Sequence, residues 1–353
     1  MRCLILLHKE TLRVSLIEGL CKLDSSTVKK LAFEVGFDLC GITSAALLVD
    51  EAERFDSWLD EGHHGEMTYL ADRPERRSNP ELLLKGARTV IVLGLNYYQK
   101  DTLDTPPSHG RVSRYARGRD YHKVIERRMR DLMQRLEQTV GNHDAAEFKW
   151  FVDFGPVLER VFAQRAGLGY IGRNSMLINQ TFGSWVFLAE IITNLELQPD
   201  SPKAVKHGTC GTCTRCIEAC PTGAIVADRV IDARMCISYL TIERPSEIPQ
   251  ELAAKMGDRI FGCDICQEVC PHNERRSKPT QHSELLAESG VGEFVNAETV
   301  FSLRTRDEFL KLTAGTALTR PKLEGLLRNA KIILENEKAG RRIVMLAFGK
   351  RRP

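Results

Sequence analysis

Residues 210–221 read Cys210-Gly-Thr-Cys213-Thr-Arg-Cys216-Ile-Glu-Ala-Cys220-Pro221. The spacing C-x2-C-x2-C-x3-C-P is typical of 4Fe–4S binding, in which the first three thiolates bind one cluster and the fourth binds another. A second run, Cys263-Asp-Ile-Cys266-Gln-Glu-Val-Cys270-Pro271, repeats this ending but has Ile260 in place of the first cysteine. The two runs therefore predict a domain that holds a pair of clusters.

One more cysteine, Cys236, lies between the runs and brings the number of candidate ligands to eight. Because the last cysteine of each run serves the cluster of the other run, the motif predicts two crossed ligand sets. The first cysteine set is Cys210, Cys213, Cys216 and Cys270, and the second cysteine set is Cys263, Cys266, Cys220 and Cys236. Structural zinc is the alternative, but zinc does not require this register. A radical-SAM cluster would need C-x3-C-x2-C, and Gly223 and Asn273 stand where its last cysteine would be.

The whole chain has 353 residues, eleven cysteines and a formal net charge of +3. This length suits two or three domains with a sizeable core. Labile clusters favour a reducing compartment, and no apolar stretch approaches the length of a membrane span. Residues 1–23 carry several charges and lack a small-residue cleavage site, so we expect an N-terminal extension rather than a signal peptide. We therefore expect a cytoplasmic protein with no membrane attachment.

Apolar patterns predict how the segments before and after the cysteines fold. Apolar runs bounded by turn residues predict strands over 37–43, 89–97, 148–155 and 183–195. Periodic patterns predict helices over 25–36, capped by Ser25 or Ser26, and over 51–61, 122–140 and 157–166. Residues 281–338 predict further amphipathic helices, including 306–312 and 322–335. We expect an α/β domain over 24–202, a cluster domain over 203–275 and a helical region with a basic tail over 276–353.

Basic residues collect between residues 111 and 130, with aromatic side chains among them. They are Arg111, Arg114, Arg117, Arg119, Lys123, Arg127, Arg128 and Arg130, and the interleaved residues are Tyr115, Tyr121 and His122. This mixture suits a phosphate-rich partner or single-stranded nucleotides. A solvated helix face, balanced by Glu126 and Asp131, is an equally good interpretation.

One carboxylate, Asp153, lies in the apolar run 148–155. If its side chain points inward, desolvation should raise the pKa of the carboxyl and keep it protonated near neutral pH, as suits a proton donor. The pattern alone favours a different interpretation, in which Asp153 is exposed at the end of the strand or caps the helix that follows.

The run Gly167-Leu-Gly169-Tyr-Ile-Gly172 has the spacing of a dinucleotide-binding loop. Such a loop follows a strand and opens a helix, whereas this run follows a predicted helix and leads into apolar residues 176–178. We therefore reject a Rossmann-type dinucleotide loop here and expect the glycines to admit a flat cofactor or a backbone at close range. The D-x-H-x-x-G motif of histidine-ligated cobalamin is also missing, because Ile125 replaces its glycine.

Taken together, these stretches resemble the epoxyqueuosine reductase family, from about residue 24 to about residue 335. The resemblance is carried by both cysteine runs and by Phe37-Asp-Leu-Cys-Gly-Ile-Thr43, Ser113-Arg-Tyr-Ala-Arg-Gly-Arg-Asp-Tyr-His-Lys123, Val152-Asp-Phe-Gly-Pro-Val-Leu-Glu-Arg160, Ala166-Gly-Leu-Gly-Tyr-Ile-Gly-Arg-Asn174, Phe182-Gly-Ser-Trp185 and Cys236-Ile-Ser-Tyr-Leu-Thr-Ile-Glu243.

The resemblance implies a cobalamin-dependent reduction of epoxyqueuosine, at the wobble position of a tRNA anticodon, to queuosine. It implies a nitroreductase-like α/β (α+β) domain that binds base-off cobalamin, followed by a ferredoxin-like domain with two 4Fe–4S clusters and the helical region. Electrons would come from an external donor to a monomeric enzyme, and the basic stretches would face the anticodon stem-loop.

The same resemblance assigns the proton donor to Asp153, which reverses the preference drawn from the pattern alone. It places cobalamin contacts at Arg77, Asp153, Gly169, Tyr170, Ile171, Gly172, Arg173, Asn174, Ser238 and Asp264. Arg173 and Phe154 depart from the family pattern, which has a lysine and a small polar residue at these places. Two alternatives of other kinds are an electron-transfer protein that never meets RNA and a corrinoid reductive dehalogenase. The latter is usually exported by a twin-arginine signal, which residues 1–23 lack.

Overall fold

The computed structural model describes residues 23–101, 104–141, 146–200 and 209–342. The predicted N-terminal extension and most of the basic tail lie outside the described residues. Within the described part, no helix combines the length and the apolar character needed to cross a bilayer.

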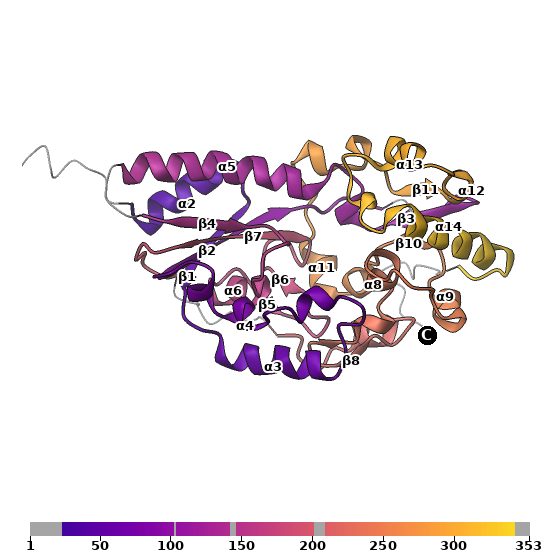
Figure 1. The fold of residues 1–353 in the computed structure, drawn as a ribbon, viewed down its shortest axis with the longest axis horizontal. Helices are drawn as coiled ribbons and strands as arrows, with labels where there is room; N and C mark the ends of the chain where they lie inside the picture. The colour runs from indigo at the N-terminus through magenta and orange to yellow at the C-terminus, as the bar shows by residue number, and fades with distance from the viewer. Residues whose placement is uncertain (1–22, 102–103, 142–145, 201–208, 343–353) are drawn as a thin grey trace, which may run out of the picture.

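A four-stranded antiparallel sheet forms the centre of the first half of the chain (Figure 1). Its order is β1 (Leu39–Ser44), β2 (Thr89–Asn96), β7 (Val186–Thr193) and β4 (Phe148–Phe151). Every residue of β2 is buried, because this strand lies inside the sheet and both of its faces are covered. The apolar runs at 37–43, 89–97, 148–155 and 183–195 thus correctly predicted all four strands, although β4 ends earlier than expected, at Phe151.

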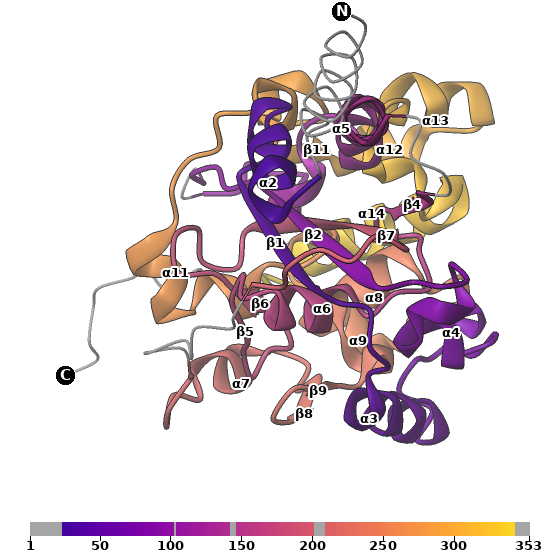
Figure 2. The same ribbon diagram turned by 90° about the vertical axis from the view of Figure 1, so that its left-hand side faces the viewer.

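Helices cover both faces of this sheet, as Figures 1 and 2 show from two sides. On one face lie α2 (Ser25–Glu34) and α5 (Tyr121–Val140), and on the other lies α6 (Glu159–Arg165). The long helix α5 forms because apolar residues such as Val124, Met129 and Leu136 recur on one side, while Asp120 caps its N-terminus. The cap of α2 is Asp24, whose side chain accepts the N–H of Thr27, and not the predicted Ser25 or Ser26.

A second sheet joins segments that are far apart in the sequence. In it, β3 (His109–Val112) pairs in parallel with β10 (Arg259–Phe261) and antiparallel with β11 (Phe294–Asn296). Three helices pack beside it through a shared apolar cluster, namely α12 (Ala297–Ser302), α13 (Arg306–Thr313) and α14 (Lys322–Lys338). The three predicted segments of the chain each contribute one strand, so this sheet ties them together.

The cysteine-rich region consists of short elements with the cysteines at their ends. They are α7 (Arg215–Ala219), β8 (Ile225–Ala227), β9 (Val230–Ile231), α8 (Ile237–Ile242), α9 (Gln250–Lys255), α10 (Ile265–Glu268) and α11 (Pro271–Arg276). The remaining helices and strands are α3 (Val49–Asp60), α4 (Glu75–Ser78), β5 (Tyr170–Ile171) and β6 (Leu177–Ile178). Single 3₁₀ turns are η1 (Thr68–Leu70), η2 (Pro80–Leu82), η3 (Arg114–Ala116), η4 (Ala233–Met235), η5 (Ser283–Leu285), η6 (Ala287–Ser289) and η7 (Ala317–Thr319).

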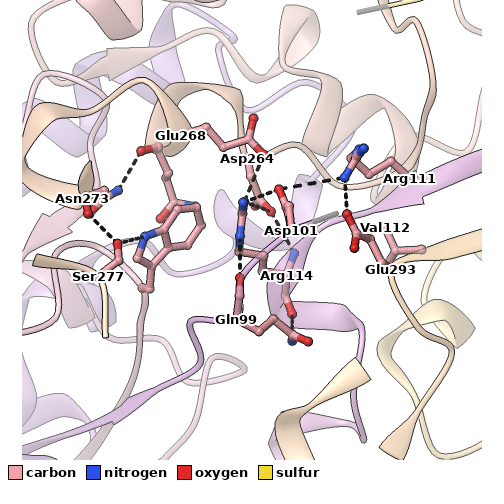
Figure 3. Close-up of polar contacts among 12 residues, drawn as sticks. Gln99, Asp101, Arg111, Val112, Arg114, Asp264, Glu268, Asn273, Ser277 and Glu293 are labelled. Atoms are coloured by element: carbon pink, nitrogen blue, oxygen red, sulfur yellow. Dashed lines mark hydrogen bonds and ion pairs between the residues drawn. The ribbon is translucent and has the colours of Figure 1, made fainter. Parts of the chain in front are cut away.

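A buried ion-pair network crosses between these regions (Figure 3). Arg114 is 5% exposed, and its guanidinium pairs with Asp101, with Asp264 at 3.3 Å and with Glu268 at 3.0 Å. Arg117 shares Asp101, and Arg111 pairs with Glu293. These three arginines belong to the basic stretch for which an RNA-facing surface was one of two interpretations. For them that interpretation is wrong, since their charges are neutralised inside the protein.

We expect Arg114→Met to be strongly destabilising, by about 3–5 kcal/mol, because it leaves buried carboxylates without their cation. Anaerobic urea unfolding of the full chain measures this loss. Arg119→Met, at an exposed neighbouring position, serves as the control and should change the free energy of unfolding by no more than about 0.5 kcal/mol. A loss for Arg114→Met as small as that of the control would contradict the network's role.

Candidate functional site

The first cysteine set lies around one hollow at the surface of the cluster region. All four members line it, although Cys270 is 54 residues from Cys216 in the sequence. Cys210 and Cys213 precede α7, Cys216 lies in α7, and Cys270 caps the N-terminus of α11. The backbone N–H of Arg173 points to the Cys210 thiol, at 3.4 Å. The structure thus brings Cys270 of the second run to the first three cysteines of the first run, as the motif predicts.

The second cysteine set also comes together from separate elements. Cys220 ends α7, Cys236 caps α8, and Cys263 and Cys266 flank the start of α10. Burial raises the pKa of the Cys266 thiol well above its usual value, and the nearby Cys263, Cys236 and Cys220 raise it further. All nine cysteines in the described ranges are free of disulfides.

The donor chemistry of both sets fits iron–sulfur clusters, because each offers four free thiols and all but Cys236 come from the two runs that end in C-x2-C-x3-C-P. The zinc alternative requires ligands that converge on one ion. Among the residues that the structure describes, no group of three or more His, Cys, Asp or Glu side chains is placed to hold a single metal ion.

A second constellation of polar groups surrounds Asp153, in the turn between β4 and α6. The predicted strand 148–155 ends at Phe151, and Asp153 adopts the left-handed region with φ 55°. Its Oδ2 accepts hydrogen bonds from the Tyr121 hydroxyl, at 2.7 Å, and from Nε2 of His122, at 3.2 Å. Its own N–H donates to Oε1 of Glu159, at 2.8 Å. The Asp153 side chain is hydrogen-bonded to Tyr121 and His122, yet it remains 54% exposed.

His122 is the positive partner of this carboxylate. Its Nδ1 lies 2.7 Å from Asp120 and its Nε2 lies 3.2 Å from Asp153. Burial acts to lower the pKa of His122, but hydrogen bonds and charges from the two aspartates raise it to about 9. At neutral pH the imidazole is therefore protonated and donates from both nitrogens.

The pKa of Asp153 shifts in the direction opposite to the one expected from the sequence. Burial acts to raise it, but hydrogen bonds from His122 and Tyr121 and the charge of Arg320 hold it below its ordinary value. The expectation that desolvation keeps Asp153 protonated is thus wrong. Asp153 does not cap α6 either, because Leu158 occupies that position.

Exposed aromatic rings form a rim around Asp153. Phe154 is 68% exposed and stacks on the His122 ring, with the ring centres 4.3 Å apart. The Arg320 guanidinium lies 5.8 Å from the Phe154 ring and 5.9 Å from the Tyr69 ring, and it forms two hydrogen bonds with Glu243. Tyr69, on η1, and Arg320, just after η7, were not predicted as site residues, because both are far from Asp153 in the sequence.

The residues expected to contact cobalamin fall into different surroundings. Arg77 is half-buried, its Nη2 donates to the Tyr69 carbonyl, and its Nε has no partner within the described residues. Ser238 is partly buried on α8. An unpaired guanidinium N–H beside the Asp153 rim can donate to the carbonyl oxygen of a cofactor's amide side chain. The carboxylate of Asp264, in contrast, already pairs with Arg114.

The run 169–174 lies at the first cysteine set. Arg173 and Asn174 line its hollow, and burial together with the nearby Cys210 and Cys270 thiols raises the pKa of Tyr170. A Cβ on Gly169 would come within 2.5 Å of the Ile178 carbonyl oxygen, and one on Gly172 within 2.6 Å of the Ile178 side chain. The glycines therefore admit a neighbouring strand, β6. A role of Gly169, Tyr170, Ile171, Gly172, Arg173 and Asn174 in cobalamin binding stays a prediction.

Three other basic residues of the stretch, Lys123, Arg127 and Arg130, are exposed on α5 and have acidic partners. Glu126 pairs with Lys123 and Arg130, at 3.2 and 2.6 Å, and Arg127 pairs with Glu284. The balanced, solvated face was the second interpretation of this stretch, and it describes these residues well.

Comparisons with known proteins agree with the sequence resemblance. Residues 77–154 match the family described as "Epoxyqueuosine reductase QueG, DUF1730", and residues 209–273 match the "4Fe-4S double cluster binding domain". The epoxyqueuosine reductase of Cyclobacterium marinum is 41% identical over 306 residues, which is 87% of this chain and 95% of that protein. The enzyme of the same name from Pseudomonas aeruginosa is 40% identical over 88% of this chain and 85% of its own length.

Solved structures show the same likeness in three dimensions. A crystal structure of an epoxyqueuosine reductase with an epoxyqueuosine-modified tyrosine tRNA stem-loop superposes with a TM-score of 0.79 at 30% identity, over 89% of this chain and 81% of that chain. The Streptococcus thermophilus enzyme gives a TM-score of 0.77 at 30% identity, over 88% and 80%. With relatives near 40% identical over most of both lengths, the chain belongs to the epoxyqueuosine reductase family.

Proposed function

We propose that this chain reduces epoxyqueuosine in tRNA to queuosine, the last step of queuosine biosynthesis. The observation that carries the proposal is the identity of about 40% with epoxyqueuosine reductases over nearly the whole length. The double-cluster region and the Asp153–His122 pair give that likeness a chemical basis, because an epoxide reduction consumes electrons and protons. The electron-transfer protein and the dehalogenase are thereby disfavoured.

The first and second cysteine sets each hold one 4Fe–4S cluster. Residues 24–202 form a nitroreductase-like domain for base-off cobalamin, in which Arg77 offers a polar contact near Asp153, and Ser238 of the cluster domain offers another. When bound, cobalamin supplies the two-electron reductant and the clusters supply it with electrons from an external donor. The enzyme acts as a cytoplasmic monomer.

The chain's own residues supply the first of the two protons, and solvent supplies the second. Conversion of an epoxide to an alkene takes two electrons and two protons and releases the oxygen as water. Asp153 is open toward the substrate side and hydrogen-bonded to a protonated His122. As charge develops on the departing oxygen, a proton passes to it from Asp153, which takes its own proton from His122. Asp120 orients the imidazole through Nδ1.

The modified base of an anticodon stem-loop is recognised at the rim. Unstacked RNA bases bind to aromatic rings and to guanidinium planes. Phe154, Tyr69 and Arg320 offer these groups next to the acid. A relative has been solved with an epoxyqueuosine-modified stem-loop, which supports this assignment of the partner.

The pH profile tests the proton source. Because the His122 pKa is raised to about 9, the imidazolium is present below that pH and is lost as the pH rises through it. We expect kcat/KM to fall through about pH 9 in the wild type. His122→Gln should lower kcat/KM by about 10²-fold and abolish this limb. A wild-type profile that stays flat through pH 9 would refute the assignment of His122.

Expression of the chain in bacteria that lack epoxyqueuosine reductase tests the function itself. Nucleosides from total tRNA should contain queuosine in place of the accumulated epoxyqueuosine. Cells carrying the Asp153→Asn variant, at equal protein level, should retain epoxyqueuosine. If the wild-type chain leaves epoxyqueuosine unchanged in cells that supply cobalamin, the proposed function is wrong.

A further inference from the structure

Two carboxyl groups meet beneath the Asp153 turn, and the function proposed above assigns a role to neither. Glu190 lies in the middle of β7, opposite Val92 of β2 and Phe151 of β4, and it is 0% exposed. Its side chain points to the sheet face that α6 covers, because it shares that face with Leu188 and Ile192. Glu159 is the first residue of α6.

Neither carboxylate oxygen of Glu190 has a conventional hydrogen-bond donor within the described residues. The carboxyl of Glu159 is near enough to raise the pKa of Glu190, both through its charge and through a side-chain hydrogen bond. Oε1 of Glu159 in turn accepts the N–H of Asp153 at 2.8 Å. Glu159 thus connects Glu190, in the buried sheet, to the backbone N–H of Asp153, the catalytic acid.

Two carboxylates in contact inside a protein cannot both be charged without a cation between them. The charged and titratable groups that act on the pair from the surrounding elements are Asp153, His122, Tyr121, Arg160 and Arg77. Burial raises the pKa of Glu190, and the nearby Glu159 and Asp153 raise it further. Arg160 and His122 act only on Glu159, so the charge of the pair belongs on Glu159 and the more tightly held proton on Glu190.

We propose that Glu190 and Glu159 are positioning residues that share a proton: Glu190 donates its O–H to the Glu159 carboxylate, and Glu159 holds the N–H of Asp153. This inference rests on the assignment of Asp153 as the acid. The hydrogen bond from Asp153 to Glu159 matters because Asp153 occupies a left-handed conformation that is unfavourable for a residue with a side chain. A hydrogen bond to a charged acceptor is about twice as strong as one to a neutral acceptor.

The hold therefore depends on pH. Burial raises the pKa of Glu159 to about 8, so the singly protonated pair forms as the pH rises toward that value, while His122 still carries its proton. Glu190→Gln places a permanent N–H donor against Glu159 and removes the competing acid. In the wild type, kcat/KM should also fall on the acidic side, as Glu159 takes up a proton. In Glu190→Gln this fall should move to lower pH by about one unit, and the fall near pH 9 should stay in place.

Infrared spectroscopy of the reconstituted full-length enzyme tests the shared proton without substrate. Above about pH 8, where Glu159 is charged and Glu190 keeps its proton, the wild type should show the C=O stretch of a protonated buried carboxyl, and Glu190→Gln should lack this band. Glu159→Gln should shift the band, which probes the pair from its other member. Glu196→Gln, an exposed glutamate just beyond β7, is the matched control and should leave both the band and the pH profile unchanged.

Glu159→Ala removes the acceptor of the Asp153 N–H, and we expect kcat to fall about tenfold with the KM for the stem-loop nearly unchanged. Glu159→Gln should restore part of that loss, since its amide oxygen also accepts. An unchanged band and an unchanged pH profile in Glu190→Gln would overturn the proposal. If the wild type made no queuosine but the band vanished in Glu190→Gln, the shared proton would stand and the proposed function would fall.

Discussion

Replacing Cys236 with alanine is expected to remove one cluster and to abolish queuosine formation. The variant should bind about four irons per chain in place of about eight, because a cubane needs four thiolates. Cys236 is the one ligand outside the two regular runs, and it caps α8 next to Cys220, Cys263 and Cys266. Iron and sulfide analysis after anaerobic reconstitution measures the loss.

Two further variants serve as a comparison and a control for the loss of iron in Cys236→Ala. Cys213→Ala, in the first cysteine set, should also retain about four irons, and its electron paramagnetic resonance signal should differ from that of Cys236→Ala. Cys40→Ala is the control, because Cys40 is buried in β1, outside both sets, and should leave the iron content unchanged. Retention of about eight irons by Cys236→Ala would contradict the crossed ligand sets.

Asp153→Asn should lower kcat by about 10²- to 10⁴-fold while iron and cobalamin binding stay at wild-type levels. The asparagine carbonyl can still accept from Tyr121 and His122, so the turn should keep its shape. What the amide cannot do is take a proton from His122 and pass it to the substrate oxygen. Single-turnover kinetics with a pre-reduced enzyme isolate this step from electron supply.

The matched control is Asp131→Asn, on the exposed side of α5, where the carboxylate pairs only with Arg135 in the described structure. It should change kcat little, since such surface pairs contribute about 0–1 kcal/mol. If Asp153→Asn turned over as fast as this control, another group would have to be the acid.

The sequence predicted the features that local patterns determine. Apolar runs found β1, β2 and β7, because strands buried in a sheet need continuous apolar residues. The motif predicted which cysteines lie together, because the spacing within each run identifies the last cysteine as a ligand of the other run's cluster. The end of β4 at Phe151 was missed, since Val152 and Phe154 continue the apolar pattern through a turn that a hydrogen bond to Glu159 stabilises.

The surroundings of charged residues were harder to predict, because their partners come from segments that are distant in the sequence. Arg114 sits in a sequence as basic as any RNA-binding segment, but two of its partners, Asp264 and Glu268, come from the cluster region 150 residues later. The lowered pKa of Asp153 arises in the same way, because His122 lies on a separate element, α5. Glu190 did carry a signal, since a glutamate inside an apolar strand must find a polar neighbour.

The central claim is tested most directly by mass spectrometry of the nucleosides in an epoxyqueuosine-modified stem-loop after anaerobic incubation with the reconstituted chain, cobalamin and a chemical reductant. The account predicts that the modified nucleoside loses one oxygen atom and is recovered as queuosine with the wild type, and that it stays an epoxide with Asp153→Asn. Recovery of unchanged epoxyqueuosine from a wild-type enzyme that carries both iron and cobalamin would contradict it.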